Sequence, residues 1–521
     1  MADTYYITTP IYYVNDVPHI GHSYTTIAAD VLARYHRGIG RDVHFLTGTD
    51  EHGIKIVKAA AEQGVSPKQL ADEVVVHFEQ LWRDLNISND DFIRTSQPRH
   101  ERRVQEIIRR LVAKDEIYLG SYQGWYDEGQ EEFVTESAAR DNEYKSAITG
   151  KPLVRYSEPS YFFRLSKWAP RLIEHIQATP SFILPETRRN EVLSKLSAGV
   201  EDLSISRPLE KLNNWGVPLP NDPAHSVYVW IDALSNYYTA LGCPPAGDEY
   251  DGKGARYWPA DVHLIGKDIL WFHAVYWPCM LMAMELPLPR CVFAHGWWTS
   301  EGKKMSKSLG NFVSCDTIAE ICKNFSRDVY RYFLLRQVPF GADGDFSHPM
   351  LLQRYNTELA NGIGNLLSRT VNMIGRYFQG TIPAPVEAHA AQGAAVVAAA
   401  EELCRSTPEA MAACQLHVPL EKLLALATET NRYIDVTEPF KLAKDPAQRP
   451  RLATVLYTCA EAVRLILLHL RPYMPESADR GLAQLGWQAP SGPSSGPSAW
   501  GVLPAGTKTA QAEALFPRKT G

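Results

Sequence analysis

The sequence lacks the patterns that mark disulfide frameworks, zinc knuckles and membrane spans. None of its eight cysteines forms a Cys-x-x-Cys pair, and scattered thiols of this kind are typical of a reducing cytosol. No stretch approaches the roughly 18 consecutive apolar residues that a transmembrane helix needs. The N-terminal run "MADTYYITTPIYYV" has no basic segment followed by an apolar one, so we expect no signal peptide. These absences predict a cytoplasmic protein that does not enter a membrane.

The sequence also has no excess of basic residues, as its formal net charge of -6 shows. This balance argues against wholesale coating by nucleic acid, although a local basic face can still recognise RNA. The 521 residues suffice for two or three domains, and a hydrophobic content of 45% is ordinary for globular proteins.

The first fifty residues alternate between strand-like and helix-like patterns. Residues 5–14 are aromatic and β-branched, residues 21–40 carry apolar side chains at helical spacing, and "DVHFLTGTDEHG" is a second strand with a polar end. A strand, helix and strand with short joints form a βαβ unit, which implies a parallel sheet. Ligands bind at the carboxyl ends of such strands, where both "PHIGH" and "GTDEHG" lie.

The remaining chain divides by composition. We expect an α/β fold, a doubly wound, Rossmann-like parallel-sheet domain with an insertion, followed by an all-α helix bundle. The expected boundaries are 1–117 and 226–290 for the two halves of the sheet domain, 118–225 for the insertion, 291–350 for a lysine-containing loop region, 351–475 for the helical domain and 476–521 for a Pro-, Gly- and Ser-rich tail.

The "PHIGHS" stretch places His19 and His22 at the start of the first helix. A zinc helix usually pairs histidines at i and i+4 with a third ligand, which is not evident here, and an acid/base pair would need a carboxylate. A phosphate site fits best, because a helix N-terminus offers free N–H groups and partial positive charge. Gly21 would let a flat base lie against the backbone. The plain alternative is a helix cap without further function.

A second polar stretch, "GKKMSKSLGN", carries Lys303, Lys304 and Lys307 between glycines. Lysines on a mobile loop can cover a triphosphate and neutralise the charge that develops during transfer. The alternative is a solvated basic loop, which is the usual fate of clustered lysines.

Together, "HIGH" and the later "KMSKS" resemble the paired signature of class I aminoacyl-tRNA synthetases. The stretches "TTPIYYVNDVPHIGHSYTTIAADVLARY", "FLTGTDEHG", "YVWIDALSNYY", "HLIGKDILWFHAVYWP" and "HGWWTSEGKKMSKSLGN" resemble the methionyl-tRNA synthetases in particular. The resemblance covers roughly residues 4–475.

This resemblance implies roles for individual residues. It implies an ATP site formed by His19, Gly21, His22, Gly266, Asp268, Lys304 and Lys307, of which His19, His22, Lys304 and Lys307 would be catalytic. It implies a methionine side-chain pocket formed by Ile11, Tyr13, Trp230, Ala233, Tyr237, Ile269 and His273, with Asp50 binding the ammonium group. The rings in this set suit a polarisable thioether. The less favoured alternative is that Trp230 and Tyr237 are plain core aromatics.

The implied activity is ATP-dependent ligation of L-methionine to its tRNA through methionyl-adenylate, with release of AMP and pyrophosphate. Mg²⁺ would accompany ATP, and the partners would be the acceptor end and the anticodon of the tRNA, bound by a monomer. Two rivals stay open. One is a class I synthetase for another amino acid, namely isoleucine, valine, leucine or cysteine, and the other is a tRNA-binding paralogue without catalytic activity.

The chain departs from the family pattern at the insertion and near position 440. Residues 118–225 contain no cysteine, so we expect no structural zinc where relatives carry cysteine knuckles. The stretch "VTEPFKLAKD" has Phe440 where the family has tryptophan, and a phenyl ring can still stack on a base. We also expect no C-terminal oligonucleotide-binding domain.

A helix expected at about 352–378 has a polar stripe of Asn361, Asn365, Arg369, Asn372 and Arg376 at 100° per residue. The stripe contains no acid, and such groups read exposed RNA bases. The opposite face is apolar and consists of Ile363, Leu366, Leu367, Thr370, Val371, Ile374 and Phe378. In the family, Asn361, Asn365 and Arg369 fall on anticodon-reading positions, to which we add Phe440; the alternative is a merely solvated face.

Overall fold

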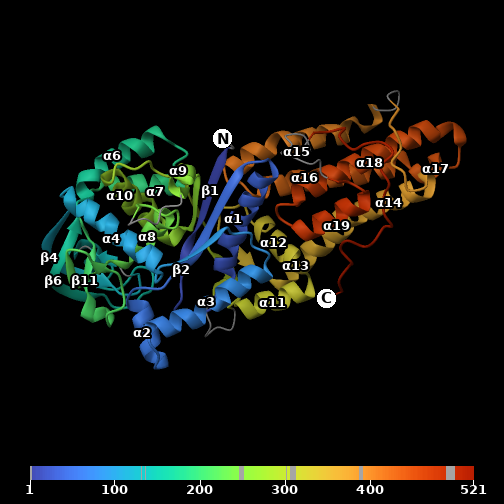
Figure 1. The fold of residues 1–521 in the computed structure, drawn as a ribbon. Coiled ribbons are helices and arrows are strands. Elements are labelled where there is room, and N and C mark those ends of the chain that lie inside the picture. Colours follow the sequence, from blue (N-terminus) through green and yellow to red (C-terminus); the bar gives the residue numbers. More distant parts are fainter. Residues whose placement is uncertain are drawn as a thin grey trace. The chain divides into compact units, whose positions relative to one another are not determined.

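The computed structural model describes residues 3–130, 132–134, 136–245, 252–300, 302–305, 312–386, 391–488 and 499–520. The chain forms two compact units. Unit 1 comprises residues 1–18, 42–83 and 87–295, and unit 2 comprises residues 19–41, 84–86 and 296–521. Figure 1 shows the elements of both in sequence colours.

The predicted strand, helix and strand at the N-terminus are confirmed. They are β1 (Thr4–Tyr13), α1 (Ile20–Gly38) and β2 (Asp42–Asp50). Strands β1 and β2 pair in parallel, with Tyr13 opposite Asp50 at their carboxyl ends. Nearly every residue of β2 is buried, as expected for a central strand of a parallel sheet covered on both faces.

Unit 1 is built on a parallel sheet that includes β1 and β2. Its strands in spatial order are β3 (Asp91–Arg94), β2, β1, β12 (Val262–Gly266), β13 (Val292–His295) and β7 (Ile183–Leu184). The helices of this part are α2 (Ile54–Gln63), α3 (Pro67–Asp84), α4 (Pro98–Ala113), α8 (Val229–Thr239), α9 (Lys253–Tyr257), the 3-10 turn η2 (Lys267–Ile269), the π-helix η3 (Phe272–Tyr276) and α10 (Trp277–Ala283). The fold class expected from the sequence is confirmed.

The insertion adds antiparallel strands and further helices. One small sheet contains β5 (Glu132–Val134), β4 (Ile117–Asp127), β6 (Val154–Phe163) and β8 (Leu203–Ser204), and another contains β10 (Pro218–Leu219), β11 (Asp222–Val227) and β9 (Ser206–Pro208). Its helical elements are α5 (Glu136–Asp141), α6 (Leu165–Ala178), α7 (Glu186–Ser197) and η1 (Leu209–Leu212). Because β7 lies within the insertion yet pairs with β13 of the main sheet, the insertion is integral to the core of unit 1.

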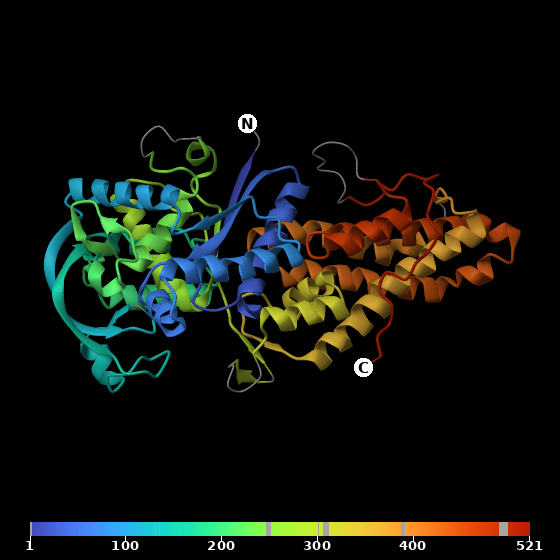
Figure 2. The ribbon, with the colours of Figure 1, turned by 60° about the horizontal axis from the view of Figure 1, so that its bottom comes forward.

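Unit 2 begins with α1 and a small sheet and continues as a helix bundle. The sheet contains β15 (Lys303–Lys304), β14 (Trp298–Ser300) and β16 (Gly344–Phe346). The helices are α11 (Cys315–Asn324), α12 (Arg327–Arg336), α13 (His348–Arg354), the π-helix η5 (Tyr355–Gly364), α14 (Asn365–Phe378), α15 (Ala394–Ala412), α16 (His417–Thr437), α17 (Pro439–Leu442), η7 (Pro446–Gln448), α18 (Arg449–Leu470) and α19 (Pro475–Leu485). Helices α15, α16 and α18 run side by side in Figures 1 and 2.

The last helices differ from expectation in two ways. The helix expected at about 352–378 is interrupted by η5, so a wheel drawn at 100° per residue does not hold over residues 355–364. Helical structure also continues beyond 475, since α19 ends at Leu485. The run 446–470 is long and apolar enough to cross a membrane, but 89% of its apolar window is buried, as in a core helix of the bundle.

The described end of the tail packs on the bundle. The carboxylate of Glu461, paired with Arg464 inside α18, accepts hydrogen bonds from the backbone N–H groups of Val502 and Leu503. Farther along, the Tyr355 hydroxyl donates to the carbonyl of Pro517 at 2.6 Å. The tail therefore contributes to the core of unit 2.

Candidate active site

The start of α1 is organised by its two histidines. His19 is the extended N-cap residue, and its Nδ1 accepts a hydrogen bond from the backbone N–H of Gly21 at 3.0 Å. The Nδ1 of His22 accepts one from the backbone N–H of His19 at 3.2 Å. His19 thus precedes the helix instead of sharing a face with His22, and the pair forms a reciprocal capping box.

This capping arrangement sets the hydrogen-bonding character of both rings. Because each Nδ1 accepts, a neutral ring at either position carries its proton on Nε2 and can donate there. The rings of His19 and His22 stack with centroids 3.9 Å apart. Burial and the neighbouring His19 ring lower the pKa of His22 well below its ordinary value. His22 is therefore a neutral N–H donor at pH 7, which suits a phosphoryl oxygen better than it suits base catalysis.

Gly21 has a local role that the sequence did not indicate. A Cβ at this position would lie 2.9 Å from Cε1 of His19, closer than carbon atoms approach. Glycine is therefore needed for the His19 ring to cap the helix.

The segment that follows the lysine-rich loop contacts the start of α1 within unit 2. The backbone N–H of Ile20 donates to the carbonyl of Val313 at 3.0 Å, and the His19 ring meets the Phe312 ring edge-on at 5.3 Å. These partners directly follow the lysine-rich loop. Lys304 lies in β15, opposite Thr299, while its side chain and the whole of Lys307 fall outside the described residues.

An aromatic group in unit 1 contains the predicted pocket residues. Trp230, at the start of α8, stacks on Phe272 with ring centroids 3.7 Å apart and nearly parallel planes, and Tyr13 meets the indole edge-on at 6.4 Å. Ala233 is buried one turn along α8, while Ile11 and Ile269 are partly buried against the same core. Such a surface offers contacts that suit a thioether.

The polar end of this group is a hydrogen-bonded pair. The Nδ1 of His273 donates to the carbonyl of Ile269 at 2.9 Å, so Nε2 accepts, and the Tyr237 hydroxyl donates to it at 2.7 Å. Burial lowers the pKa of His273 to about 4. The ring is consequently neutral at physiological pH, which keeps a fixed charge out of an apolar pocket.

Asp50 ends β2 and is buried with 2% of its surface exposed. Its register partner in β1 is Tyr13, so the predicted ammonium ligand and one aromatic pocket residue lie on neighbouring strands. At the end of β12, a Cβ on Gly266 would lie 2.5 Å from the Asp268 carboxylate. Glycine at position 266 thus allows Asp268 to take the orientation observed.

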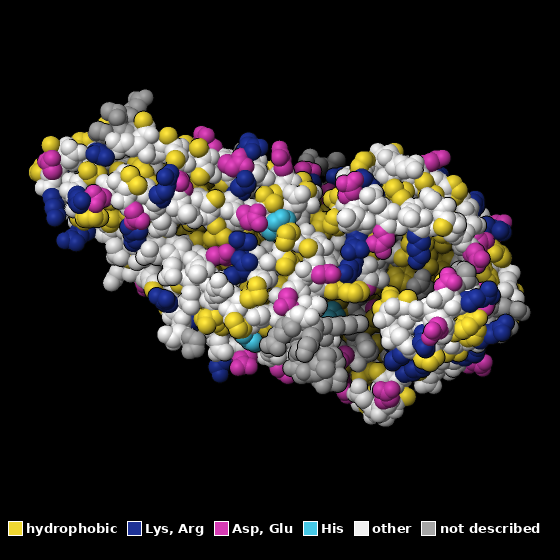
Figure 3. All heavy atoms as spheres, turned by 180° about the vertical axis from the view of Figure 1, so that it is seen from behind, with side chains coloured by type: hydrophobic (Ala, Val, Ile, Leu, Met, Phe, Trp, Pro, Cys, Tyr) yellow, Lys and Arg dark blue, Asp and Glu magenta, His cyan; other side chains and the backbone are white. Residues whose placement is uncertain are grey.

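The predicted polar stripe in unit 2 faces solvent. Asn361 and Asn365 are exposed, Arg369 is half-buried, and Phe440 on α17 is 50% exposed. On the opposite face, the predicted apolar residues are buried except Phe378, which is half-buried. The stripe has an acidic neighbour that its own helix does not contain, because Asp435 of α16 accepts from Arg369 at 2.8 Å. Lysine, arginine and acidic side chains intermingle over the face shown in Figure 3.

Sequence reasoning missed several residues around the pocket. Phe272 stacks on Trp230, and its only sequence signal is its position next to His273 in "WFHAV". Glu51, His52 and Asp232 are all buried near Asp50 and α8. The sequence signal that could have identified these three residues is their charge, which interrupts runs of apolar or strand-forming residues.

Within the part of the chain that the structure describes, no group of three or more His, Cys, Asp or Glu side chains could hold a metal ion. The absence of structural zinc stays a prediction, to be tested on the purified protein.

Known proteins resemble this chain along nearly its whole length. A family model described as "tRNA synthetases class I (M)" matches residues 5–142 and 140–371. The methionine--tRNA ligase of Caldanaerobacter subterraneus is 47% identical over 99% of this chain and 79% of its own, and that of Rickettsia felis is 46% identical over 93% of both chains. Methionyl-tRNA synthetase of Mycobacterium tuberculosis, in complex with methionyl-adenylate, superposes with a TM-score of 0.92 at 43% identity, over 99% of this chain and 100% of that one. With its fold, its two signature motifs and this similarity, the chain belongs to the class I methionyl-tRNA synthetases, enzymes that attach methionine to tRNA at the expense of ATP.

Proposed function

We propose that methionine binds in unit 1 with its thioether among Tyr13, Trp230 and Tyr237 and its ammonium group on Asp50. The observation that carries this proposal is the pairing of Tyr13 with Asp50 at the carboxyl ends of adjacent strands. In this arrangement the apolar pocket contacts the methionine side chain, and the buried carboxylate of Asp50 contacts the ammonium group. Ile11, Ala233, Ile269 and His273 complete the pocket.

The reaction needs no covalent intermediate with the protein. The methionine carboxylate attacks the α-phosphorus of ATP in line, and pyrophosphate leaves from the opposite side. The Nε2–H groups of His19 and His22, together with Lys304 and Lys307, stabilise the negative charge that develops on the phosphoryl oxygens. Gly266 and Asp268 bind ATP, with Asp268 on the ribose. The 2′-hydroxyl of the terminal adenosine of the tRNA then attacks the carbonyl carbon of methionyl-adenylate, the acyl–phosphate bond breaks, and AMP leaves.

Mg²⁺ enters as part of the substrate, bound to the phosphates of ATP. Mg²⁺ typically keeps several waters and uses substrate phosphates as ligands. This arrangement fits a protein whose described residues include no group of three potential metal-binding side chains.

The tRNA is recognised at two places. Its acceptor end reaches the adenylate, and its anticodon meets Asn361, Asn365, Arg369 and Phe440, which are partly or fully exposed on the bundle. We propose that the protein acts as a cytoplasmic monomer without structural zinc. The domain boundaries given from the sequence belong to the same proposal.

Methionine-dependent exchange of pyrophosphate into ATP tests the assignment directly. Exchange that requires methionine, and is not supported by isoleucine, valine, leucine or cysteine, is expected. Exchange with one of those amino acids would favour a sister enzyme, and no exchange from folded protein would favour a non-catalytic tRNA-binding paralogue.

Asp50→Asn should raise the methionine KM sharply and leave the ATP KM nearly unchanged, because it weakens only a charge-assisted contact to the ammonium group. A parallel rise of both KM values would contradict the role of Asp50.

A further inference from the structure

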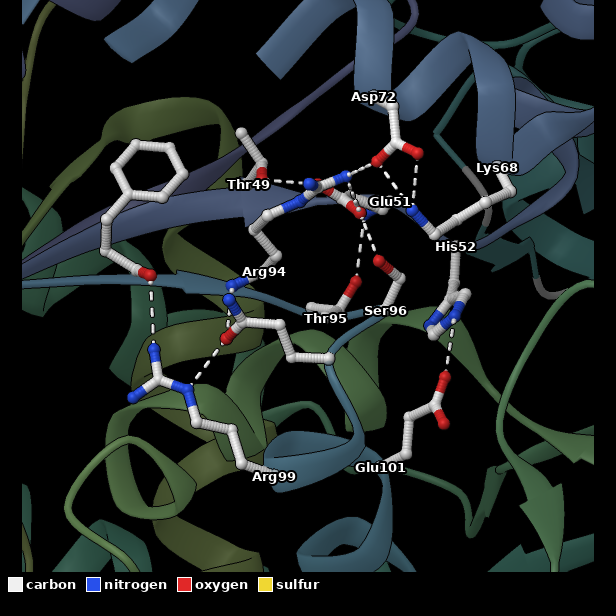
Figure 4. A network of polar contacts seen from close by, with 12 residues as sticks. Thr49, Glu51, His52, Lys68, Asp72, Arg94, Thr95, Ser96, Arg99 and Glu101 are labelled. Atoms are coloured by element: carbon white, nitrogen blue, oxygen red, sulfur yellow. Dashed lines mark hydrogen bonds and ion pairs between the residues drawn. The ribbon is translucent and has the colours of Figure 1, made fainter. Parts of the chain in front are cut away.

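The segment Asp50–Glu51–His52 carries three buried ionisable side chains in a row. Their exposed fractions are 2%, 0% and 3%. Ionisable residues are almost never buried without partners. Only Asp50 is assigned to methionine, so the other two must be accounted for by contacts within the protein. Figure 4 shows Glu51 directed towards Arg94 and His52 towards Glu101.

Glu51 is held on the side of β3. Its carboxylate accepts two hydrogen bonds from Arg94, at 2.6 and 3.0 Å, and others from Thr49 at 2.8 Å and Ser96 at 2.5 Å. The backbone N–H of Glu51 donates to Thr95 Oγ1 at 2.9 Å. A bidentate arginine pair of this kind is among the stronger charge-assisted contacts. The residue that follows Asp50 is therefore fixed in both main chain and side chain.

His52 is held by Asp232 of α8. Its Nδ1 lies 2.7 Å from Oδ2 of Asp232, whose Oδ1 lies 2.9 Å from Nε2 of His100 in α4. The Nδ1 of His100 lies in turn 2.7 Å from the Thr239 hydroxyl at the end of α8. Asp232 is 1% exposed and stands in α8 between Trp230 and Ala233. One carboxylate thus ties the end of β2 and the start of α4 to α8.

The charges of this cluster favour a tight ion pair. Burial alone would raise the pKa of Asp232, but His52 and His100 lower it to about 2. Burial works against a charge on His52, yet Asp232, with Glu101 and Glu51 farther away, leaves the pKa of His52 raised above its ordinary value. Glu101 Oε1 lies 3.7 Å from His52 Nε2, and the Trp215 ring meets the imidazole edge-on at 5.2 Å. Both shifts act in the same direction and favour protonated His52 beside ionised Asp232 at pH values below the raised pKa of His52.

We propose that Asp232 is a positioning residue for methionine: through His52 it fixes the ammonium-binding end of β2 relative to the side-chain pocket on α8. The proposal rests on the assignment of Asp50 to the substrate ammonium group. Asp232 itself does not contact methionine in this scheme. Methionine must contact a carboxylate on one element and an aromatic pocket on another at the same time. The distance between these two elements must therefore be fixed, because a displacement of about 1 Å between them weakens binding or slows the reaction.

The test is a double-mutant cycle on methionine binding. Asp232→Asn keeps the shape of the side chain and removes its charge, so it should raise the methionine KM by at least about tenfold, or 1.4 kcal/mol, with kcat and the ATP KM nearly unchanged. If Asp232 acts through Asp50, the variant carrying both Asp50→Asn and Asp232→Asn should bind methionine no more weakly than Asp50→Asn alone. Independent losses that add in the double variant would refute the proposal.

A matched control is Asp202→Asn. Asp202 accepts hydrogen bonds from Tyr118 at 2.9 Å and from Ser166 at 2.6 Å, and none of these three residues is assigned to the methionine pocket. This control should leave the methionine KM unchanged, which separates positioning from a general effect of losing a hydrogen-bonded aspartate. If Asp50→Asn by itself leaves the methionine KM unchanged, the proposed function fails before the positioning role is tested.

A second variant covers the possibility that Asp232→Asn does not fold. His52→Asn places a neutral amide donor near the Nδ1 position and removes the ring and its charge. It should reproduce the rise in methionine KM and the lack of additivity with Asp50→Asn.

In the wild-type protein, methionine affinity should fall as the pH rises above about 6.5 and through the raised pKa of His52, and His52→Asn should lack that fall. Identical pH profiles for both proteins would overturn the proposal.

Discussion

Arg369 offers a clean test of RNA recognition, because the ion pair that it forms with Asp435 is solvent-exposed. The guanidinium lies 2.8 Å from Asp435, with the two side chains 35% and 67% exposed. Exposed ion pairs of this type contribute about 0–1 kcal/mol to stability. Arg369→Ala should therefore leave the protein folded. If the guanidinium contacts the anticodon, kcat/KM for tRNA charging should fall by at least about tenfold, which is 1.4 kcal/mol.

Asp435→Asn provides the matched comparison. It removes the same ion pair but retains Arg369 and takes a negative charge away from an RNA-facing surface, so charging should be unchanged or improved. Both variants should support normal pyrophosphate exchange without tRNA, since that assay depends on the adenylate site. The two activities are measured on one preparation of each variant. Equal losses of charging in both variants, or normal charging by Arg369→Ala, would refute the reasoning.

The remaining predictions concern the adenylate site, zinc and acid stability. His22→Ala should slow single-turnover adenylate formation by about a hundredfold, or roughly 3 kcal/mol of lost charge stabilisation; a near wild-type rate would contradict the phosphate role. Gly21→Ala should also slow this step, because its Cβ would displace the His19 ring 2.9 Å away, and a wild-type rate would show that capping by His19 is dispensable. Elemental analysis should find no stoichiometric zinc, and about one zinc per chain would overturn the argument from the missing cysteines. The pKa of Asp232 is lowered from 3.8 to about 2, so the contribution of its charge to stability is present above pH 4 and is lost as the pH falls towards 2. Acid unfolding followed by circular dichroism should therefore show a shallower transition for Asp232→Asn than for the wild-type protein. An unchanged transition would count against the ion pair.

Local patterns were sufficient for the elements of the first βαβ unit and for the two signature motifs. The strand at residues 5–14, the helix after Gly21 and the second strand are found as β1, α1 and β2, because hydrophobic periodicity and glycine positions are properties of neighbouring residues. The amphipathic faces around residues 361–376 were likewise predictable, apart from the π-helix at Tyr355–Gly364. Whether a segment becomes π-helical depends on how it packs in the folded protein, and a hydrophobic period of 3.6 residues gives no information about that packing.

The sequence by itself determined the fold class, the family resemblance and the types of side chain available for methionine, ATP and RNA. Only the tertiary structure decided that the histidines cap the helix reciprocally, that Asp435 pairs with Arg369, and that Asp232 joins His52 to His100. Asp232 and His52 are 180 residues apart, and no local pattern encodes which buried charges meet. The cost of leaving a buried charge unpaired ensures that such partners exist, but the folded topology selects them.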